Sequence, residues 1–185
     1  MKLLWLDEPA SGTAAIEGAL IESDCMGLIV SALDRETQIY ARELALPLVV
    51  RVPLPQNDGL DMTNAILALG PEVLRAAAWA YDPRYRARGA VIEIAEVTKA
   101  ALALLWELGE AFDAWLGRSA REWTFWAACQ KVDGARMLKA SNIRCAMPGP
   151  QSSYAGLLGR PCHLEFPEAA VGELPSRLEV VRYGG

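Results

Sequence analysis

The segment from Ala95 to Leu116 limits the possible folds more than any other part of the sequence. Its apolar residues recur at the 3.6-residue spacing of an α-helix, and Gly117 stands where a helix commonly ends. Five charged residues interrupt this apolar pattern, which is too many for a membrane span of about 20 residues. We therefore predict an amphipathic helix over 95–116, packed on the core of a globular protein, and no membrane-spanning segment.

Apolar segments near both ends of the chain predict β-strands, because they are short and rich in Leu, Ile and Val. The polar residues Asp34–Thr37 lie between two of these segments and suit a hairpin connection. We therefore expect antiparallel pairing. The predicted strands are residues 2–6, 26–33, 39–52, 162–166 and 178–183.

Proline and glycine divide the middle of the chain. Residues 51–60 contain two prolines, an asparagine and a glycine, which favour turns, so this loop is the best candidate for an internal domain boundary. Helices are predicted over 61–69 and 71–81, and Asp82-Pro83 ends the second of them. An extended segment over 84–92 follows.

A chain of 185 residues that is 52% hydrophobic can bury one core of ordinary size. We expect a single domain over residues 1–185. The predicted fold class is α+β, with mixed antiparallel β-sheet elements at both ends and a central helical segment over about residues 61–117.

The cysteines and the single histidine narrow the candidate chemistry. Cys25, Cys129, Cys145 and Cys162 form no C-x-x-C pair, so they predict reduced, buried thiols. His163 alone excludes a multi-histidine metal site. Cys162 and His163 are neighbours in a predicted strand, so their side chains point to opposite faces and cannot form a nucleophile–base pair.

The charge is unevenly distributed. The net charge is −5, yet residues 1–74 carry 4 basic and 11 acidic side chains, whereas residues 75–144 carry 11 basic and 8 acidic ones. Such asymmetry indicates either a basic binding face on an acidic body or segments that interleave in space.

Arginines and aromatic residues alternate within the basic segment. Arg84, Arg86 and Arg88 have the period of two that lines one face of a strand, and Tyr85 lies among them. Arg118 and Arg121 stand near further tryptophans. Cations that bind phosphates beside rings that stack on bases are typical of single-strand binding. The alternative is an arginine-rich subunit contact, with the tryptophans in the core.

Asp7 and Glu8 follow the first predicted strand. Residues 3–12 resemble the Walker B and D-loop segment of ABC-type ATPases, but the sequence has no G-x-x-x-x-G-K-[ST] loop for the phosphates. A phosphoacceptor domain also has an acidic pair after its first strand. It needs in addition an acceptor Asp and a Lys, and this sequence has neither at a suitable position. Whether Asp7 and Glu8 bind a metal stays open. Asp58 and Asp61 form a second carboxylate pair of the kind that caps and turns also use.

Residues 137–142, 154–166 and 178–183 together resemble the C-terminal half of small phage-encoded single-stranded-DNA-binding proteins. The resemblance covers at most a quarter of the chain, and the family's Gly-rich front half has no counterpart here. It implies that Gly159 forms the turn from which a strand begins. The implied strand-binding residues are Lys139, Arg160, Arg182 and Tyr183.

We therefore expect a non-enzymatic binding protein of a phage or mobile element that engages single-stranded nucleic acid, without a cofactor or a metal. Because Asp7 and Glu8 interrupt the apolar start, no signal peptide is predicted, and the expected location is the host cytoplasm or a virion. The alternative is a structural or assembly protein whose partners are other subunits or itself. The predicted nucleic-acid-binding residues are Arg84, Tyr85, Arg86, Arg88, Arg118, Arg121, Lys139, Arg160, Arg182 and Tyr183.

Overall fold

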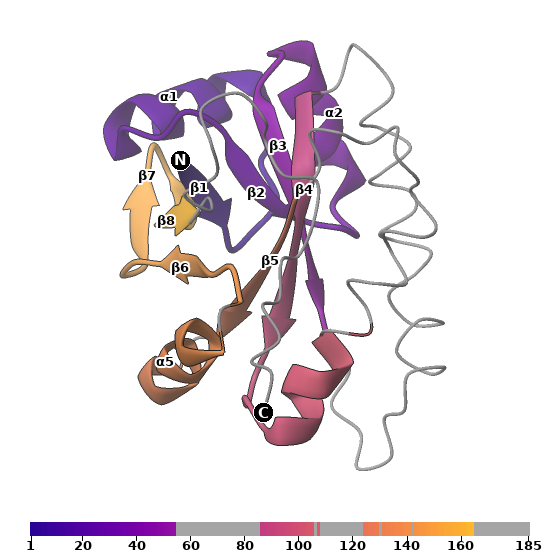
Figure 1. Cartoon of the computed structure of the whole chain (residues 1–185). Coiled ribbons are helices and arrows are strands. Elements are labelled where there is room, and N and C mark those ends of the chain that lie inside the picture. Colours follow the sequence, from indigo (N-terminus) through magenta and orange to yellow (C-terminus); the bar gives the residue numbers. More distant parts are fainter. Residues whose placement is uncertain (55–85, 106, 108–123, 130, 142, 165–185) are drawn as a thin grey trace, which may run out of the picture.

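The computed structural model of the chain describes residues 1–54, 86–105, 107, 124–129, 131–141 and 143–164 (Figure 1). Residues 99–105 and 107 are helical and carry no label in Figure 1. The other elements are β1 (Lys2–Leu6), α1 (Thr13–Ser23), β2 (Leu28–Ser31), α2 (Arg35–Glu43), β3 (Pro47–Pro53), β4 (Arg86–Ile94), β5 (Thr124–Cys129), α5 (Val132–Ala140), β6 (Ala146–Pro148), β7 (Ser152–Tyr154) and β8 (Leu157–Leu164).

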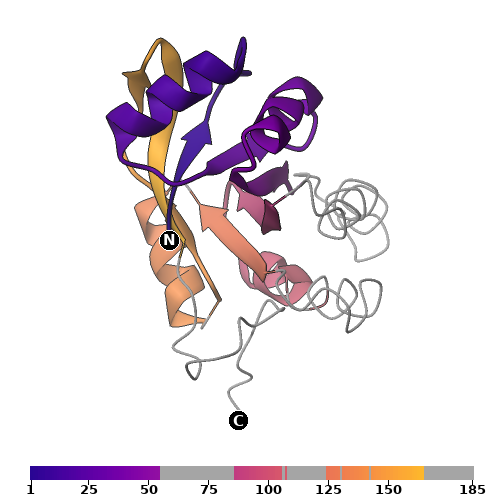
Figure 2. The ribbon, with the colours of Figure 1, turned by 90° about the horizontal axis from the view of Figure 1, so that it is seen from above.

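The described strands form one mixed sheet that is nearly closed. Their order is β5-β4-β3-β2-β1-β8-β6, and β7 pairs with β8. Neighbours from β1 to β5 are parallel, whereas β8 runs antiparallel to β1, β6 and β7. The ends of this order meet at one parallel bridge between Ala127 and Cys145, where the Ala127 N–H donates to the Arg144 carbonyl oxygen at 2.9 Å. Seen from above, α1, α2 and α5 lie outside the strands (Figure 2).

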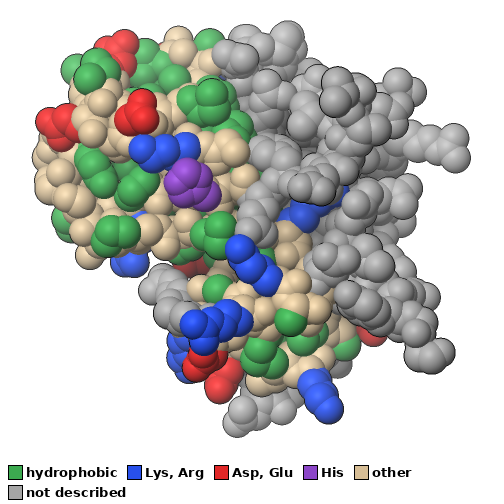
Figure 3. All heavy atoms as spheres, turned by 60° about the vertical axis from the view of Figure 1, so that its left-hand side comes forward, with side chains coloured by type: hydrophobic (Ala, Val, Ile, Leu, Met, Phe, Trp, Pro, Cys, Tyr) green, Lys and Arg blue, Asp and Glu red, His purple; other side chains and the backbone are tan. Residues whose placement is uncertain are grey.

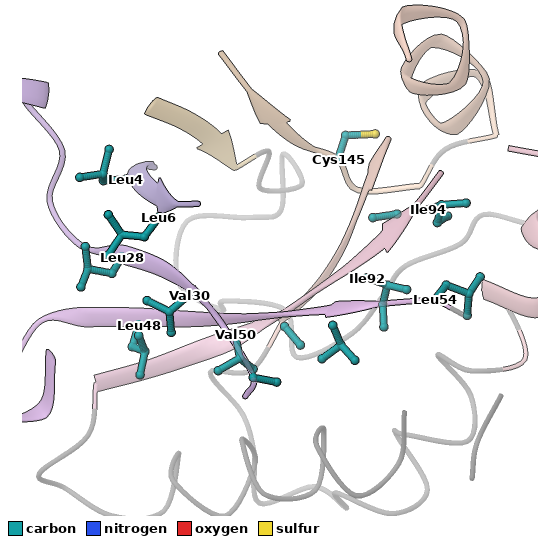
Figure 4. Close-up of a cluster of buried hydrophobic side chains, with 14 of the residues drawn as sticks. Leu4, Leu6, Leu28, Val30, Leu48, Val50, Leu54, Ile92, Ile94 and Cys145 are labelled. Atoms are coloured by element: carbon teal, nitrogen blue, oxygen red, sulfur yellow. The ribbon is translucent and has the colours of Figure 1, made fainter. Parts of the chain in front are cut away.

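Each face of the sheet packs its own core. On the outer face, alternate strand residues such as Leu4, Val30 and Val50 pack against helix residues that include Ile16 and Leu138 (Figure 4). The described residues that are buried in the inner cluster all come from strands, which is expected for the inside of a curved sheet. These residues are Leu3, Trp5, Ile29, Val49, Val91, Trp126, Ala128, Ala146, Cys162 and Leu164.

The predicted hairpin at Asp34–Thr37 is wrong. Asp34 caps α2 instead, because its Oδ1 accepts a hydrogen bond from the Thr37 N–H at 3.1 Å. The chain then crosses back as a helix, so β2 and β3 are parallel. Residues 39–43, predicted as strand, are the second half of α2, and β3 begins at Pro47. Acidic Glu36 in the first turn and basic Arg42 in the last favour the helix over the strand.

The fold class is confirmed as a mixture of helices and strands, but the expected arrangement differs. The N-terminal β-structure is parallel and interleaved with α1 and α2, and α1 was not predicted. β4 confirms the extended segment, and β8 contains the predicted strand from residue 162 to 164. The helix predicted over 95–116 is observed at residues 99–105 and 107. The helices predicted over 61–69 and 71–81 and the strand over 178–183 lie outside the described residues.

Two side chains of α2 hold the loops that follow β1 and β2. The Thr37 hydroxyl accepts a hydrogen bond from the Ala10 N–H at 2.8 Å. The Gln38 amide donates to the carbonyl oxygens of Ser31, at 2.8 Å, and Ala32. These contacts fix the chain just after the carboxyl ends of two parallel strands. In the described part of the chain, no helix is both long and apolar enough to cross a membrane.

A substitution at Gly27 tests the parallel arrangement, because this residue precedes β2 at the point where the chain approaches the start of β3. A Cβ atom at Gly27 would overlap the carbonyl oxygen of Pro47, which cannot move without disturbing β3. We expect Gly27→Ala to lower the free energy of unfolding by about 1–3 kcal/mol, as overpacking does. Urea denaturation measures this loss. The control is Ser153→Ala at an exposed position of β7, expected to change stability by less than about 0.5 kcal/mol; equal effects of the two changes would contradict the packing.

Candidate functional site

Polar side chains gather on the inner face of the sheet where the parallel strands end. Because β1 to β5 run the same way, their carboxyl ends lie at one end of the sheet. Barrel-like folds commonly place their ligand sites at this end. The residues concerned, here called the carboxyl-end cluster, are Trp5, Asp7, Arg51, Glu93 and Arg160.

Strand alternation accounts for the inward direction of these side chains. Arg51 lies two residues after Val49, and Glu93 two residues after Val91, both of which belong to the inner core. Arg160 is the register partner of Trp5 on β8. Arg51 and Glu93 therefore share the inner face with Trp5 and Arg160.

Arg51 and Glu93 form an ion pair next to Trp5. The Nη1 of Arg51 lies 3.5 Å from the Oε2 of Glu93, and the two side chains are 19% and 21% exposed. The guanidinium carbon of Arg51 lies 5.1 Å from the centroid of the Trp5 ring, within the range of a cation–π contact. Trp5 is fully buried. The ring therefore supports the guanidinium from below while Glu93 compensates its charge.

Asp7 and Arg160 form the second ion pair of the cluster. The Nε of Arg160 lies 3.1 Å from the Oδ2 of Asp7, and the side chains are 25% and 18% exposed. The Gln151 amide donates to the same oxygen at 2.7 Å. Two donors thus hold the Asp7 carboxylate in place.

Glu8 has a separate role. One of its carboxylate oxygens accepts a hydrogen bond from the Leu158 N–H at 2.9 Å, near the start of β8. Asp7 and Glu8, which the sequence suggested as a metal-binding pair, therefore have different protein partners. Within the described residues, no group of three or more His, Cys, Asp or Glu side chains is arranged to hold a metal ion.

Two N–H groups of the cluster have no acceptor among the described residues. They are the indole Nε1 of Trp5 and the Nε of Arg51, and both atoms are buried. An unsatisfied buried donor costs about 1–3 kcal/mol, and native structures contain few of them. Each of these N–H groups therefore needs an acceptor that the described residues do not supply.

The structure places the predicted nucleic-acid-binding residues in several regions. Arg160 lies in the carboxyl-end cluster, and Lys139 is exposed in the last turn of α5. Arg86 and Arg88 lie on β4, which pairs with β3 and β5 on its two sides. The others, which lie outside the described residues, are Arg84, Tyr85, Arg118, Arg121, Arg182 and Tyr183.

Sequence reasoning missed Trp5, Arg51 and Glu93 as site residues. A signal was present, because Arg51 and Glu93 are single charged residues inside strongly apolar strands, Val49–Val52 and Val91–Ile94. Charged residues are rarely buried unless they are paired. A lone charge in each of two neighbouring strands could therefore have predicted their contact.

The cysteine prediction is confirmed. All four cysteines are free and buried. Burial raises the pKa of the Cys162 thiol to about 12, so it is protonated at neutral pH. His163, the single histidine, is exposed at the surface (Figure 3), whereas Cys162 is buried in the inner core. The two side chains do not form a catalytic pair.

Comparisons with protein-family models, curated proteins and solved structures found no match. The function is therefore inferred from the carboxyl-end cluster.

Asp7 is the first residue of the cluster to test. Asp7→Asn removes the charge that faces Arg160 and weakens two hydrogen bonds, so we expect the free energy of unfolding to fall by about 1–3 kcal/mol. Chemical denaturation at neutral pH measures the change.

The control is Asp133→Asn, which breaks an exposed pair with Arg136 on α5, where the side chains are 93% and 78% exposed. Its expected effect is less than about 0.5 kcal/mol. A loss at Asp7 no larger than at Asp133 would mean that the inner pair does not hold the structure together.

Proposed function

We propose that the protein binds a small polar ligand at the carboxyl-end cluster. The observation that carries the proposal is the meeting of two shielded ion pairs, Arg51–Glu93 and Arg160–Asp7, at one end of the inner face. Ligand sites typically combine an apolar lining with a few convergent polar groups. Trp5 is the register partner of Arg160 and contacts the guanidinium of Arg51, so both arginines lie next to its indole.

A purely structural role accounts less well for these residues. Shielded ion pairs contribute little net stability, and apolar side chains of similar volume often replace them without loss. The inner face nearer the amino ends of the strands is filled in that way, by Leu3, Ile29 and Leu164 among others. Two shielded ion pairs at the carboxyl ends of these strands are better explained by a ligand that they contact.

A thermal-shift panel tests the proposal. The panel holds nucleotides, sugar phosphates, dicarboxylates, amino acids and polyols, each added to the full chain. A ligand present at about 100 times its Kd stabilises the folded state by about 2.7 kcal/mol, which corresponds to a Tm increase of roughly 5–10 °C for a domain of this size. Arg160→Gln should abolish the shift, because it removes one of the two cations.

The matched control for Arg160→Gln is Arg136→Gln, which removes an exposed arginine of α5 and should leave the shift unchanged. A Tm that responds to no class of compound, or that responds equally in Arg160→Gln and the wild type, contradicts a ligand site in the cluster.

Binding of single-stranded nucleic acid stays a separate prediction, supported by the basic residues of the middle segment in the sequence. Fluorescence anisotropy with a labelled oligonucleotide tests it at about 50 mM and about 200 mM salt, because phosphate contacts weaken steeply over this range. Arg84→Ala, Arg86→Ala and Arg88→Ala combined should weaken binding and flatten the salt dependence. Absence of binding at the lower salt concentration contradicts this function.

The assembly alternative also stays a prediction. Ile21 and Leu33 are the most exposed of the large apolar side chains that the structure describes. Ile21 is near the end of α1, whereas Leu33 follows the carboxyl end of β2. Because α1 returns the chain to the amino end of β2, the two side chains lie at opposite ends of the sheet. They do not support one shared contact surface.

A further inference from the structure

The indole of Trp5 requires an explanation that the fold alone does not supply. Its ring belongs to the inner core, and the side chain is 1% exposed. Its Nε1–H has no acceptor among the residues that the structure describes. A phenylalanine, which is apolar but smaller, would leave no donor unsatisfied in this part of the core. The N–H therefore points to a partner outside the described chain.

Arg51, like Trp5, has a buried N–H group without an acceptor among the described residues. Glu93 contacts Nη1, whereas Nε and Nη2 form the other edge of the guanidinium, which is the edge that binds a carboxylate or phosphate through two parallel hydrogen bonds. The Nε is buried and has no acceptor in the described residues. The contact to Glu93, at 3.5 Å, is long for a charge-assisted hydrogen bond. Arg51 therefore keeps capacity to bind a second anion.

The two donors are on side chains in direct contact. The guanidinium carbon of Arg51 lies 5.1 Å from the Trp5 ring centroid, so the two unsatisfied N–H groups belong to neighbouring side chains. The remaining carboxylate of the cluster is engaged elsewhere, because Asp7 binds Arg160 and Gln151. The described carboxylates of the cluster thus leave both donors available.

We infer that the cluster recognises an oxyanion, the carboxylate or phosphate group of its ligand, through the Nε–H of Arg51 and the indole N–H of Trp5. The inference rests on the proposed ligand site and names the chemical class that the site selects. Glu93 holds Arg51 in place, and Trp5 fixes the plane of the guanidinium. Asp7 and Arg160 are left to contact the rest of the ligand.

The test uses inorganic phosphate, sulfate and succinate as probes with the full-length chain. Tm and intrinsic tryptophan fluorescence are recorded against sodium chloride at the same ionic strength. At least one probe should raise Tm beyond the chloride control and give a saturable fluorescence change. Trp5→Phe removes the N–H together with the five-membered ring of the indole, and Arg51→Lys keeps the charge but removes the two-nitrogen edge. Each change should raise the Kd of that probe roughly tenfold.

Arg136→Lys, an exposed position of α5, is the matched control and should leave the Kd unchanged. Far-UV circular dichroism checks that each variant folds; if Arg51→Lys does not, Trp5→Phe alone decides. The inference is wrong if none of the probes exceeds the chloride control, or if Trp5→Phe binds as tightly as the wild type. In that case a neutral compound that stabilises the wild type but not Arg160→Gln would leave the proposed ligand site standing without its oxyanion.

Discussion

A curved sheet must fill its inner face with its own side chains, and the rest of this structure depends on that constraint. The buried residues of this inner cluster that the structure describes all come from strands, and Trp5 and Trp126 are the largest of them. Helices cover the outer face instead, where Ile16 and Leu138 pack on the strands. The two cores are thus separate. On the inner face, polar residues replace apolar ones at the carboxyl ends of the parallel strands.

That exchange sets the character of the site. Trp5 packs in the inner core and also contacts the guanidinium of Arg51, so this one side chain belongs to both the core and the site. Each arginine of the cluster is accompanied by a carboxylate at 3.1–3.5 Å, as partly buried guanidinium groups require. The shielding also strengthens any interaction that a ligand makes there, because the surrounding dielectric is lower than that of water.

Sequence patterns identified individual elements better than their pairing. The strands around residues 2–6, 28–31 and 86–94 follow from runs of Leu, Ile and Val. Asp34–Thr37 misled, because the same polar residues suit a hairpin turn and a helix N-terminus, and only the Asp34 cap distinguishes them. Once α2 replaces the hairpin, β2 and β3 change from antiparallel to parallel. This one local misassignment therefore reversed the predicted pairing of β2 and β3.

The site was harder to predict than the fold, for a related reason. Arg160 was selected through a resemblance and Asp7 through its neighbour Glu8, yet the two form a pair only because β8 lies beside β1. Arg51 and Glu93 come together only because β3 and β4 are parallel neighbours. Pairing of distant strands is not encoded in any local pattern.

The single bridge between Ala127 and Cys145 has a consequence for how the protein moves. Every other pair of neighbouring strands that the structure describes shares at least two register pairs, so the junction of β5 and β6 has the least backbone bonding. Local opening needs the least free energy where few such bonds break. Glu93 of the carboxyl-end cluster is the register partner of Ala128, which directly follows Ala127 of this bridge. The junction of β5 and β6 is therefore where we expect the described sheet to open first.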